Sequence, residues 1–372
     1  MAGVHFSLVE VVPGVAGVFQ AIDAVHNLFE TETSVAIVAQ GADLAALRLD
    51  QPPLCEEPSL ILLTSGTSGN PRAVEIPLSA LAHSAESAAV YMQQMAVWLT
   101  ALPVTSMGGL NTIVRSALTG IEPVIWDGVG GAAKFESENF VPFIKAVKTA
   151  SLKSNLASAV SLVPTQLFRI ALDPMALTEL AELDFVLVGG GGLSAGLKSE
   201  CAKAGVKMVS TYGATETVGG CVFNGLALGG FEFSVVDDLV QIESENLAWG
   251  YRDGEALNGI WKSKDRGEIV DGKLQILGRS DTVIKVAGVT VDLHDFENQL
   301  QSRISNQEIV VVGIEDPQYG FAPLVVSDAE IENLAELANE ILKVALPVRF
   351  KLMADIPMLK NGKPDRIAIA KH

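Results

Sequence analysis

The amino-acid sequence predicts an α/β fold, with a large N-terminal domain of mostly parallel sheets and helices followed by a small α+β C-terminal domain. The chain has 372 residues, 49% of them apolar, so it can bury at least one large core and form two domains. Apolar runs of strand length alternate with helical patterns, which is typical of parallel sheets. Glycine- and hydroxyl-rich segments follow several of these runs, where such sheets place their ligands.

Composition and charge indicate which binding partners and which cellular compartment to expect. A net charge of -18 disfavours nucleic acid, which binds proteins through lysine and arginine on its phosphates. We find no run of about 18 apolar residues and no basic segment ahead of an apolar core, so neither a membrane span nor a secretory signal is expected. Cys55, Cys201 and Cys221 are odd in number and form no CxxC pair, which indicates a reducing cytoplasm.

The first part of the chain predicts a β-loop-α-β pattern. A helix is expected over residues 16–30, and a second over 78–98 with Ser79 as its cap. A glycine turn at SMGGL, followed by a further helix, separates two buried strands. The strands expected here cover residues 34–39, 98–104 and 124–126.

The pattern repeats in the middle of the chain, with helices after Pro164 and before Gly205. The expected strands cover residues 159–163, 185–188 and 206–210. Gly190, Gly192 and Ala195 also satisfy the G-x-G-x-x-A form of a dinucleotide fingerprint, so an NAD-binding oxidoreductase is kept as an alternative. The next strand, however, ends in Ser-Thr-Tyr where that fingerprint requires an acidic residue.

A loop rich in glycine and hydroxyl groups is the strongest local signal. The stretch LLTSGTSGNPRAVEIP lies between two apolar runs, and its backbone N–H and side-chain O–H groups suit several phosphate oxygens at once. It lacks the spacing and the Gly-Lys-Ser/Thr of a Walker A loop. The residues expected to bind a polyphosphate are Thr64, Ser65, Gly66, Thr67, Ser68 and Gly69.

Four ordered motifs resemble the adenylate-forming acyl- and aryl-CoA synthetase superfamily. They are TSGTSGNPR, YGATE at residues 212–216, WKSKD followed by GRSDTVIK, and PMLKNGKPDR near residue 363. The resemblance implies ATP, Mg²⁺ and coenzyme A as cofactors or co-substrates, and two steps in which an acyl-AMP forms first and CoA then displaces AMP. It also implies a mobile C-terminal domain that rotates between the steps, with domains at 1–280 and 281–372.

The resemblance assigns roles to individual residues. Tyr212 would lie on adenine, Thr215 would bond the α-phosphate, and Glu216 would hold Mg²⁺. Lys363 would stabilise the charge of the first step, because a lysine offers a mobile point charge. The other expected positions are Gly190 and Gly191 at the nucleotide, Asp265 and Arg279 at the ribose, Asp281 at the hinge, and Gly288 on a strand near the CoA tunnel. At WKSKD, Ser263 and Lys264 replace the usual Thr-Gly.

Two further stretches resemble the branch of the superfamily that ligates 2-succinylbenzoate, an aromatic carboxylate, to CoA in menaquinone biosynthesis. These are LPVTSMGGLNTIVRSALTG and SLVPTQL. The positions expected to contact the acid are Ser106, which stands where the branch has a histidine, Arg115, Thr165 and Gly213. Another aryl- or acyl-CoA ligase and a non-catalytic nucleotide binder stay as alternatives, and a homodimer is left open.

Overall fold

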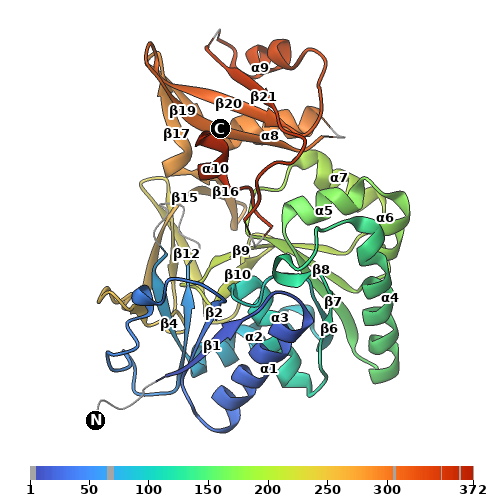
Figure 1. The fold of residues 1–372 in the computed structure, drawn as a ribbon, viewed down its shortest axis with the longest axis vertical. Helices are drawn as coiled ribbons and strands as arrows, with labels where there is room; N and C mark the ends of the chain where they lie inside the picture. The colour runs from blue at the N-terminus through green and yellow to red at the C-terminus, as the bar shows by residue number, and fades with distance from the viewer. Residues whose placement is uncertain (1–5, 65–70, 305–306, 345, 360–361, 372) are drawn as a thin grey trace.

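A computed structural model of the chain describes residues 6–64, 71–304, 307–344, 346–359 and 362–371. Three sheets form the larger, N-terminal part, and a fourth sheet forms a smaller lobe at the C-terminal end (Figure 1). The two parts have separate hydrophobic cores, because the clusters built on Phe296 and Ile356 contain only residues beyond 283. This architecture confirms the predicted fold class.

The central sheet has seven strands in the order β11-β10-β9-β8-β7-β5-β6. The strands from β6 to β9 run parallel, and β10 and β11 are antiparallel additions at one edge. Parallel strands carry ligands at their carboxyl ends, so the loops after β8 and β9 are placed to form a site. Its strands are β5 (Ala96–Thr100), β6 (Val124–Ile125), β7 (Ala157–Leu162), β8 (Phe185–Gly189), β9 (Met208–Ala214), β10 (Gly219–Phe223) and β11 (Leu226–Ala227).

A five-stranded sheet stands beside it, in the order β1-β2-β3-β4-β14. The strands β3 and β4 are antiparallel neighbours, and the predicted phosphate loop connects them. The strands of this sheet are β1 (Ser7–Val11), β2 (Val35–Ala39), β3 (Ser59–Leu63), β4 (Ala73–Pro77) and β14 (Gly250–Tyr251). Their burial is almost complete in β2, β3 and β4, as the continuous apolar sequences require.

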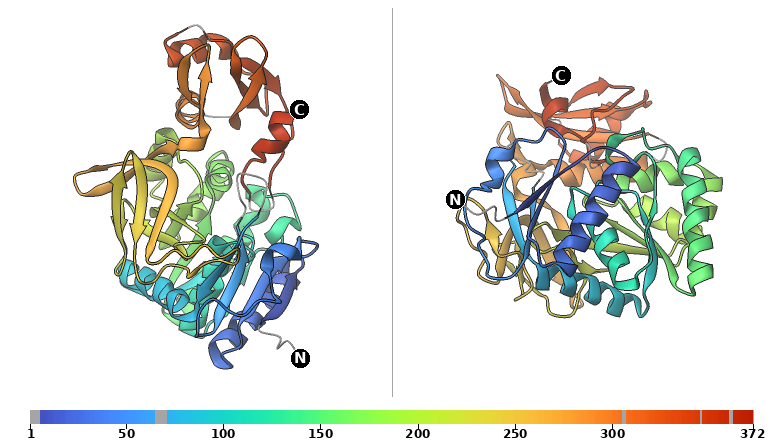
Figure 2. Two further views of the ribbon diagram at one scale, coloured as in Figure 1. Left: turned by 90° about the vertical axis from the view of Figure 1, so that its left-hand side faces the viewer. Right: turned by 60° about the horizontal axis from the view of Figure 1, so that its bottom comes forward.

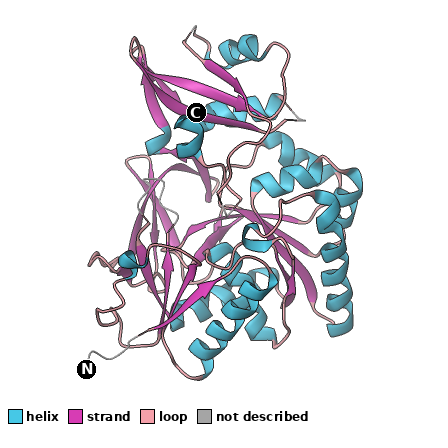
Figure 3. Ribbon diagram, viewed as in Figure 1, coloured by secondary structure: helices cyan, strands magenta, loops and turns pink. Residues whose placement is uncertain are grey.

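Helices cover both faces of the central sheet (Figures 1 and 3). Three of them lie between the two sheets and four cover the outer face. The inner helices are α1 (Val15–Glu30), α2 (Leu78–Met92) and α3 (Met107–Thr119). The outer helices are α4 (Ser137–Ser154), α5 (Pro164–Ala171), α6 (Pro174–Ala181) and α7 (Ala195–Lys203). None of the helices in the described ranges combines the length and the apolar character needed to cross a membrane.

The third sheet is antiparallel and leads into the C-terminal lobe (Figure 2). Its strands are β12 (Glu232–Val236), β13 (Leu239–Glu243), β15 (Ile260–Val270) and β16 (Lys273–Arg279). A single turn of 3₁₀ helix, η3 (Ser280–Thr282), then joins β16 to the fourth sheet. The predicted domain boundary falls on this turn and stays a prediction.

The C-terminal lobe is a small α+β unit. Its strands are β17 (Val283–Val286), β18 (Val289–Asp292), β19 (Ile309–Asp316), β20 (Gly320–Ser327) and β21 (Arg349–Leu352). Its helices are α8 (Leu293–Arg303), α9 (Leu334–Leu342) and α10 (Arg366–Lys371). Asp292 begins α8, since its carboxylate accepts hydrogen bonds from the backbone N–H groups of His294 (3.0 Å) and Asp295 (3.3 Å).

Some predicted bounds were wrong. The second helix ends at Met92 rather than at 98, and β5 takes up the residues that follow. Ser79 is not its cap, because Pro77 precedes the helix and Ser79 donates instead to Glu57. The predicted glycine turn is the first turn of α3. β9 runs on to Ala214, so that Tyr212 lies within the strand.

Candidate active site

Asp265 and Arg279 lie opposite each other in the β15–β16 pair, facing the end of β9. Their antiparallel register makes them direct partners, and Arg279 Nη1 lies 3.3 Å from Asp265 Oδ1. The hydroxyl of Tyr212 in β9 donates to the other oxygen, Oδ2, at 2.8 Å. Three residues from distant parts of the sequence therefore meet, as their motifs predicted.

Arg279 also binds the predicted hinge residue. Its Nε and Nη2 atoms donate to the two oxygens of Asp281 in η3, each at 2.8 Å. The Arg279 guanidinium holds the pKa of the Asp281 carboxyl below its usual value, and this pair in turn raises the pKa of Arg279. The hinge position is thus tied to the predicted ribose site through one guanidinium.

Lys363 comes from the C-terminal lobe and lies over the glycine loop after β8. A methyl group on Gly190 would lie 3.1 Å from Lys363 Cε and 3.4 Å from its Nζ. Burial lowers the pKa of the Lys363 ammonium, Arg279 lowers it further, and Asp265 opposes both. The lysine is therefore a half-buried cation beside the same carboxylate that Tyr212 and Arg279 contact.

Contacts between the two parts hold Lys363 in this position. The hydroxyl of Thr165 at the start of α5 donates to the carbonyl oxygen of Gly362 at 2.7 Å. Nearby, Arg169 pairs with Glu308 of the C-terminal lobe at 3.0 Å. Thr165 was predicted at the acid, which stays a prediction, and in the structure its hydroxyl binds the residue before the lysine.

Glu216 lies in the turn between β9 and β10. Its Oε1 atom accepts a hydrogen bond of 2.6 Å from the Tyr251 hydroxyl, and its other oxygen accepts none within the described ranges. Those ranges contain no cluster of three metal-ligating side chains. One carboxylate together with substrate phosphates is a usual Mg²⁺ environment, so Glu216 fits the predicted ion.

The turn that carries Glu216 is strained and strongly held. Val218 has a φ of 57°, in the left-handed region that β-branched residues rarely adopt. Its carbonyl oxygen accepts hydrogen bonds from Ser84 Oγ of α2 (3.1 Å) and Asn111 Nδ2 of α3 (2.9 Å). Thr215, the predicted phosphate ligand, begins the same turn and accepts from the N–H of Val218. Two helices therefore fix the conformation of the loop that presents Thr215 and Glu216.

The predicted phosphate loop is described only at its two ends. Thr64 and Arg72 exchange hydrogen bonds, from Thr64 N to Arg72 O (2.8 Å) and from Arg72 N to Thr64 Oγ1 (3.1 Å). The remaining predicted phosphate ligands, Ser65, Gly66, Thr67, Ser68 and Gly69, lie outside the described residues.

Three of the predicted glycines have local reasons for being glycine. A methyl on Gly213 would collide with the carbonyl oxygen of Gly219, so the close pairing of β9 and β10 requires it. Gly190 has a φ of 77°, which favours glycine. Gly288 was predicted on a strand, but it lies in the two-residue turn between β17 and β18, next to Ala287 at φ 52°. A methyl on Gly191 would lie 3.5 Å from Pro164 Cγ of α5, which is an ordinary contact.

One face of α3 carries polar residues into the interior. Ser106 precedes the helix and donates to the Pro103 carbonyl at 2.8 Å. Asn111 reaches the turn after Glu216, and Arg115 lies one helical turn further along the same face. Arg115 is 6% exposed, its guanidinium lies 4.9 Å from the Trp98 ring centroid, and burial lowers its pKa to about 10. Its Nε has no hydrogen-bond partner in the described part of the chain.

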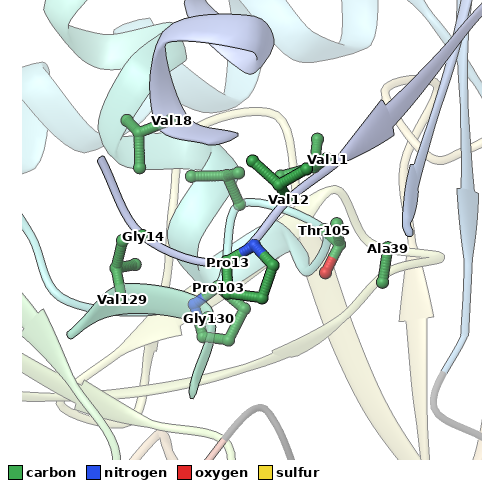
Figure 4. Close-up of a pocket in the computed structure, with 11 residues that line it drawn as sticks. Val11, Val12, Pro13, Gly14, Val18, Ala39, Pro103, Thr105, Val129 and Gly130 are labelled. Carbon is green, nitrogen blue, oxygen red and sulfur yellow. The ribbon is translucent and has the colours of Figure 1, made fainter. Parts of the chain in front are cut away.

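A small cavity lies beside the loop of residues 103–105, which leads to Ser106 (Figure 4). It has a volume of about 30 Å³ and lies between the β1–α1 connection and the loop after β5. Its lining is almost entirely apolar, with Val11, Pro13, Val18, Pro103 and Val129 among its residues. This space holds about one water molecule and cannot take a substrate.

Sequence reasoning missed Tyr251, Arg72 and Asn111. Tyr251 follows Trp-Gly in a stretch with no recognisable motif, and Arg72 meets its partner Asp253 across 181 positions of sequence. For Asn111 a signal existed, since Asn111 and Arg115 form a polar pair four residues apart on an otherwise apolar helix face.

Comparison with known proteins identifies the family. The profile of the AMP-binding enzyme family matches residues 16–240. A protein of Mycobacterium tuberculosis (strain ATCC 25618 / H37Rv), named Probable 2-succinylbenzoate--CoA ligase, is 32% identical over 346 residues, which cover 88% of either chain. The 2-succinylbenzoate--CoA ligase of Escherichia coli (strain K12) is 26% identical over 377 residues, covering 95% of this chain and 76% of its own.

Solved structures share the fold. A variant of Escherichia coli MenE with bound OSB-AMS superposes with a TM-score of 0.77 at 22% identity, covering 99% of this chain and 88% of its own. The o-succinylbenzoate coenzyme A synthetase (MenE) of Bacillus subtilis, in complex with ATP and magnesium ion, superposes with a TM-score of 0.73 at 19% identity. The match covers 99% of this chain and 89% of that structure's chain.

These findings do not favour the dinucleotide alternative, and neither does the geometry, because Lys363 and His294 occupy the space above Gly190 and Gly192. The family profile covers more than half of the chain, and the Mycobacterium tuberculosis relative exceeds 30% identity over most of it. The chain therefore belongs to the AMP-binding enzyme family.

Proposed function

We propose that this protein ligates 2-succinylbenzoate to coenzyme A in an ATP-dependent reaction, through an acyl-AMP, and releases AMP and pyrophosphate. The observation that carries the proposal is the position of Lys363 beside Asp265, Arg279 and Gly190. A cation brought over the strand ends by a separate lobe suits a reaction in which negative charge develops on a phosphate. The names of the relatives supply the acid. The sequence resemblance to the menaquinone branch of the superfamily supplies the pathway.

In the first step a carboxylate oxygen attacks the α-phosphate of ATP and pyrophosphate leaves. Lys363 stabilises the charge that develops between the two anions. Asp265 accepts hydrogen bonds from the ribose hydroxyls, while Tyr212 and Arg279 keep it oriented. Glu216 would hold Mg²⁺, which neutralises phosphate charge when bound. The reacting groups are thereby brought together in one orientation.

In the second step the CoA thiolate attacks the acyl carbonyl and AMP leaves. We propose that the lobe formed by residues 281–372 rotates about Asp281 between the two steps, which withdraws Lys363 and brings the turn at Gly288 to the site. Asp281 suits such a pivot, because it lies in the short turn η3 between the two parts and its carboxylate binds Arg279 at 2.8 Å. The unpaired thiols of Cys55, Cys201 and Cys221 suit the reducing cytoplasm that we propose as its location.

The second carboxylate of 2-succinylbenzoate needs a cation in a protein of net charge -18. We propose Arg115 for this role. Arg115 is buried, and its Nε lacks a hydrogen-bond partner in the described ranges. It lies one helical turn after Asn111, whose side chain contacts the loop that carries Glu216. A guanidinium binds a carboxylate through two parallel hydrogen bonds, which would satisfy it.

Replacing Arg115 tests the acid specificity. Arg115→Leu is expected to raise KM for 2-succinylbenzoate by roughly 10- to 100-fold, because a hydrogen bond to a charged group contributes about 1.5–3 kcal/mol. The KM for a monocarboxylate analogue that lacks the distal carboxylate should change little. Arg115→Lys, which keeps the charge, should recover part of the loss. Equal increases in KM for both acids would show that Arg115 only supports Trp98 and does not bind the distal carboxylate.

Replacing Asp265 tests the nucleotide site. Asp265→Ala is expected to raise KM for ATP by roughly 10- to 100-fold, again from the loss of charged hydrogen bonds. The ratio of kcat/KM for two different acids should stay as in the parent protein. Glu268→Ala, which removes an exposed carboxylate from the same strand, is the matched control. A changed acid preference with unchanged use of ATP would move Asp265 out of the nucleotide site.

The function as a whole is tested by pyrophosphate release across a panel of carboxylic acids, with and without CoA. We expect a single turnover with 2-succinylbenzoate and ATP alone, and steady turnover once CoA is added. Turnover with a different aryl or acyl acid would support another ligase of the family. ATP binding without pyrophosphate release for any acid would indicate a non-catalytic nucleotide binder.

A further inference from the structure

The segment 248–255 joins the strand that leaves the phosphate loop to the turn that carries Glu216. The N–H of Ala248 donates to the Glu216 carbonyl oxygen at 2.9 Å. The N–H groups of Trp249 and Arg252 donate to the carbonyl oxygens of Glu75 and Ala73 in β4, each at 2.9 Å. This segment, which includes β14, therefore links two parts of the site that are far apart in sequence.

Tyr251 is the side chain of this segment that reaches the site. It is 8% exposed, and its hydroxyl donates to Glu216 Oε1 at 2.6 Å. A phenol is a neutral hydrogen-bond donor near neutral pH, and here its proton faces the carboxylate. A short bond from a neutral donor to a carboxylate restricts the rotation of that carboxylate.

Arg72 fixes the ring of Tyr251 from the other side. Its guanidinium carbon lies 3.4 Å from the ring centroid. Two hydrogen bonds of 2.7 and 2.8 Å hold the guanidinium on Asp253, and a third of 2.7 Å reaches Glu255. A cation over the face of a tyrosine is attracted by the negative charge of the ring face, so the stack stabilises the position of the phenol.

We propose that Tyr251 is a positioning residue, which orients the Glu216 carboxylate for the metal ion of the adenylating step. Glu216 sits on a turn with no other side-chain partner for its carboxylate in the described ranges. Without the phenol, the carboxylate could rotate and would lose orientation entropy each time the ion bound. The inference rests on the proposed function of Glu216.

The experiment compares Tyr251→Phe, which removes only the hydroxyl, with Glu216→Gln and with the double variant. The readouts are Mn²⁺ binding in the presence of non-hydrolysable α,β-methylene-ATP, followed by electron paramagnetic resonance, and the Mg²⁺ dependence of pyrophosphate release. We expect Tyr251→Phe to weaken Mn²⁺ binding about tenfold, in line with the loss of a hydrogen bond to a charged group. Tyr91→Phe, which removes a hydroxyl from α2, is the control and should leave both readouts unchanged.

The double variant separates positioning from general support of the fold. If Tyr251 acts through Glu216, adding Tyr251→Phe to Glu216→Gln should cause little further loss, whereas independent effects would add. Additive losses, or unchanged Mn²⁺ binding in Tyr251→Phe while Glu216→Gln is impaired, would overturn the inference and leave the proposed function intact. Normal Mn²⁺ binding in Glu216→Gln would overturn the metal role of Glu216 and the inference together.

A second variant keeps the inference testable if Tyr251→Phe does not fold. Glu216→Asp retains the charge but draws the carboxylate back by one methylene, away from the phenol. We expect it to bind Mn²⁺ about tenfold more weakly than the parent protein. Unchanged binding would show that the contact with Tyr251 is dispensable.

Discussion

Lys363→Ala should lower the rate of acyl-adenylate formation by roughly 10²- to 10³-fold, the loss typical for removing a group that stabilises charge in a transition state. The reason is the position of the ammonium, half-buried beside Asp265 and Arg279, where water does not screen its charge fully. Thioester formation from chemically prepared succinylbenzoyl-AMP and CoA should be nearly unchanged, because in the proposed cycle the lysine has withdrawn before that step. Measuring both half-reactions on one preparation gives the comparison.

The pH dependence provides a second readout on the same variant. The lysine acts as a cation, and its pKa is lowered from 10.5, so the adenylation rate of the parent protein should fall as pH rises, starting below that value. In Lys363→Ala the adenylation rate should not show this fall with rising pH. Lys371→Ala, in the exposed part of α10, is the matched control. If thioester formation falls as far as adenylation, the assigned role is wrong.

Glu75→Ala should lower the free energy of unfolding by about 3–5 kcal/mol, since it leaves a buried guanidinium without its counter-charge. The side chains of Glu75 and Arg252 are both 0% exposed and lie 2.8 Å apart. Arg252 also donates to carbonyl oxygens of the loop before β3, and Glu75 accepts from Leu54 N and Ser59 Oγ, each at 2.9 Å. The measurement is urea unfolding followed by circular dichroism.

An exposed ion pair gives the control for this stability measurement. Glu179 pairs with Lys145 at 3.0 Å, with side chains 31% and 58% exposed, and Glu179→Ala should lower the unfolding free energy by at most about 1 kcal/mol. Combining Glu75→Ala with Arg252→Met should restore part of the loss, because the unpaired charge is then gone. A loss in Glu75→Ala no larger than in the control would show that water reaches the pair.

The fold class could be predicted because apolar runs and helical patterns alternate over most of the chain. The end of α2 could not be predicted from the sequence. Gln93 ends this helix with a φ of 56°, a left-handed conformation that usually marks glycine or asparagine, so the sequence carried no stop signal. Asp292 before α8 is the opposite case, where a side chain that caps the helix is visible in the sequence.

The site could be predicted where one motif supplies one contact. Tyr212, Asp265, Arg279 and Lys363 each come from a recognisable stretch, and the structure brings them together. The motif around Thr165 did not reveal the hydrogen-bond partner of its hydroxyl, which is a backbone carbonyl 197 positions away. Contacts of this kind depend on the packing of the two parts and leave no periodic or local pattern in the sequence.

The strained turn at Val218 has a consequence for how this site can change during evolution. The left-handed conformation of a valine is unfavourable by itself, and the hydrogen bonds from Ser84 and Asn111 offset that cost. Losing either donor is therefore more harmful while residue 218 is valine than it would be with glycine, which adopts this φ without strain. The order of substitutions matters: a lineage that first acquires glycine at 218 can alter α2 and α3 at these positions, whereas one that keeps valine must retain both donors.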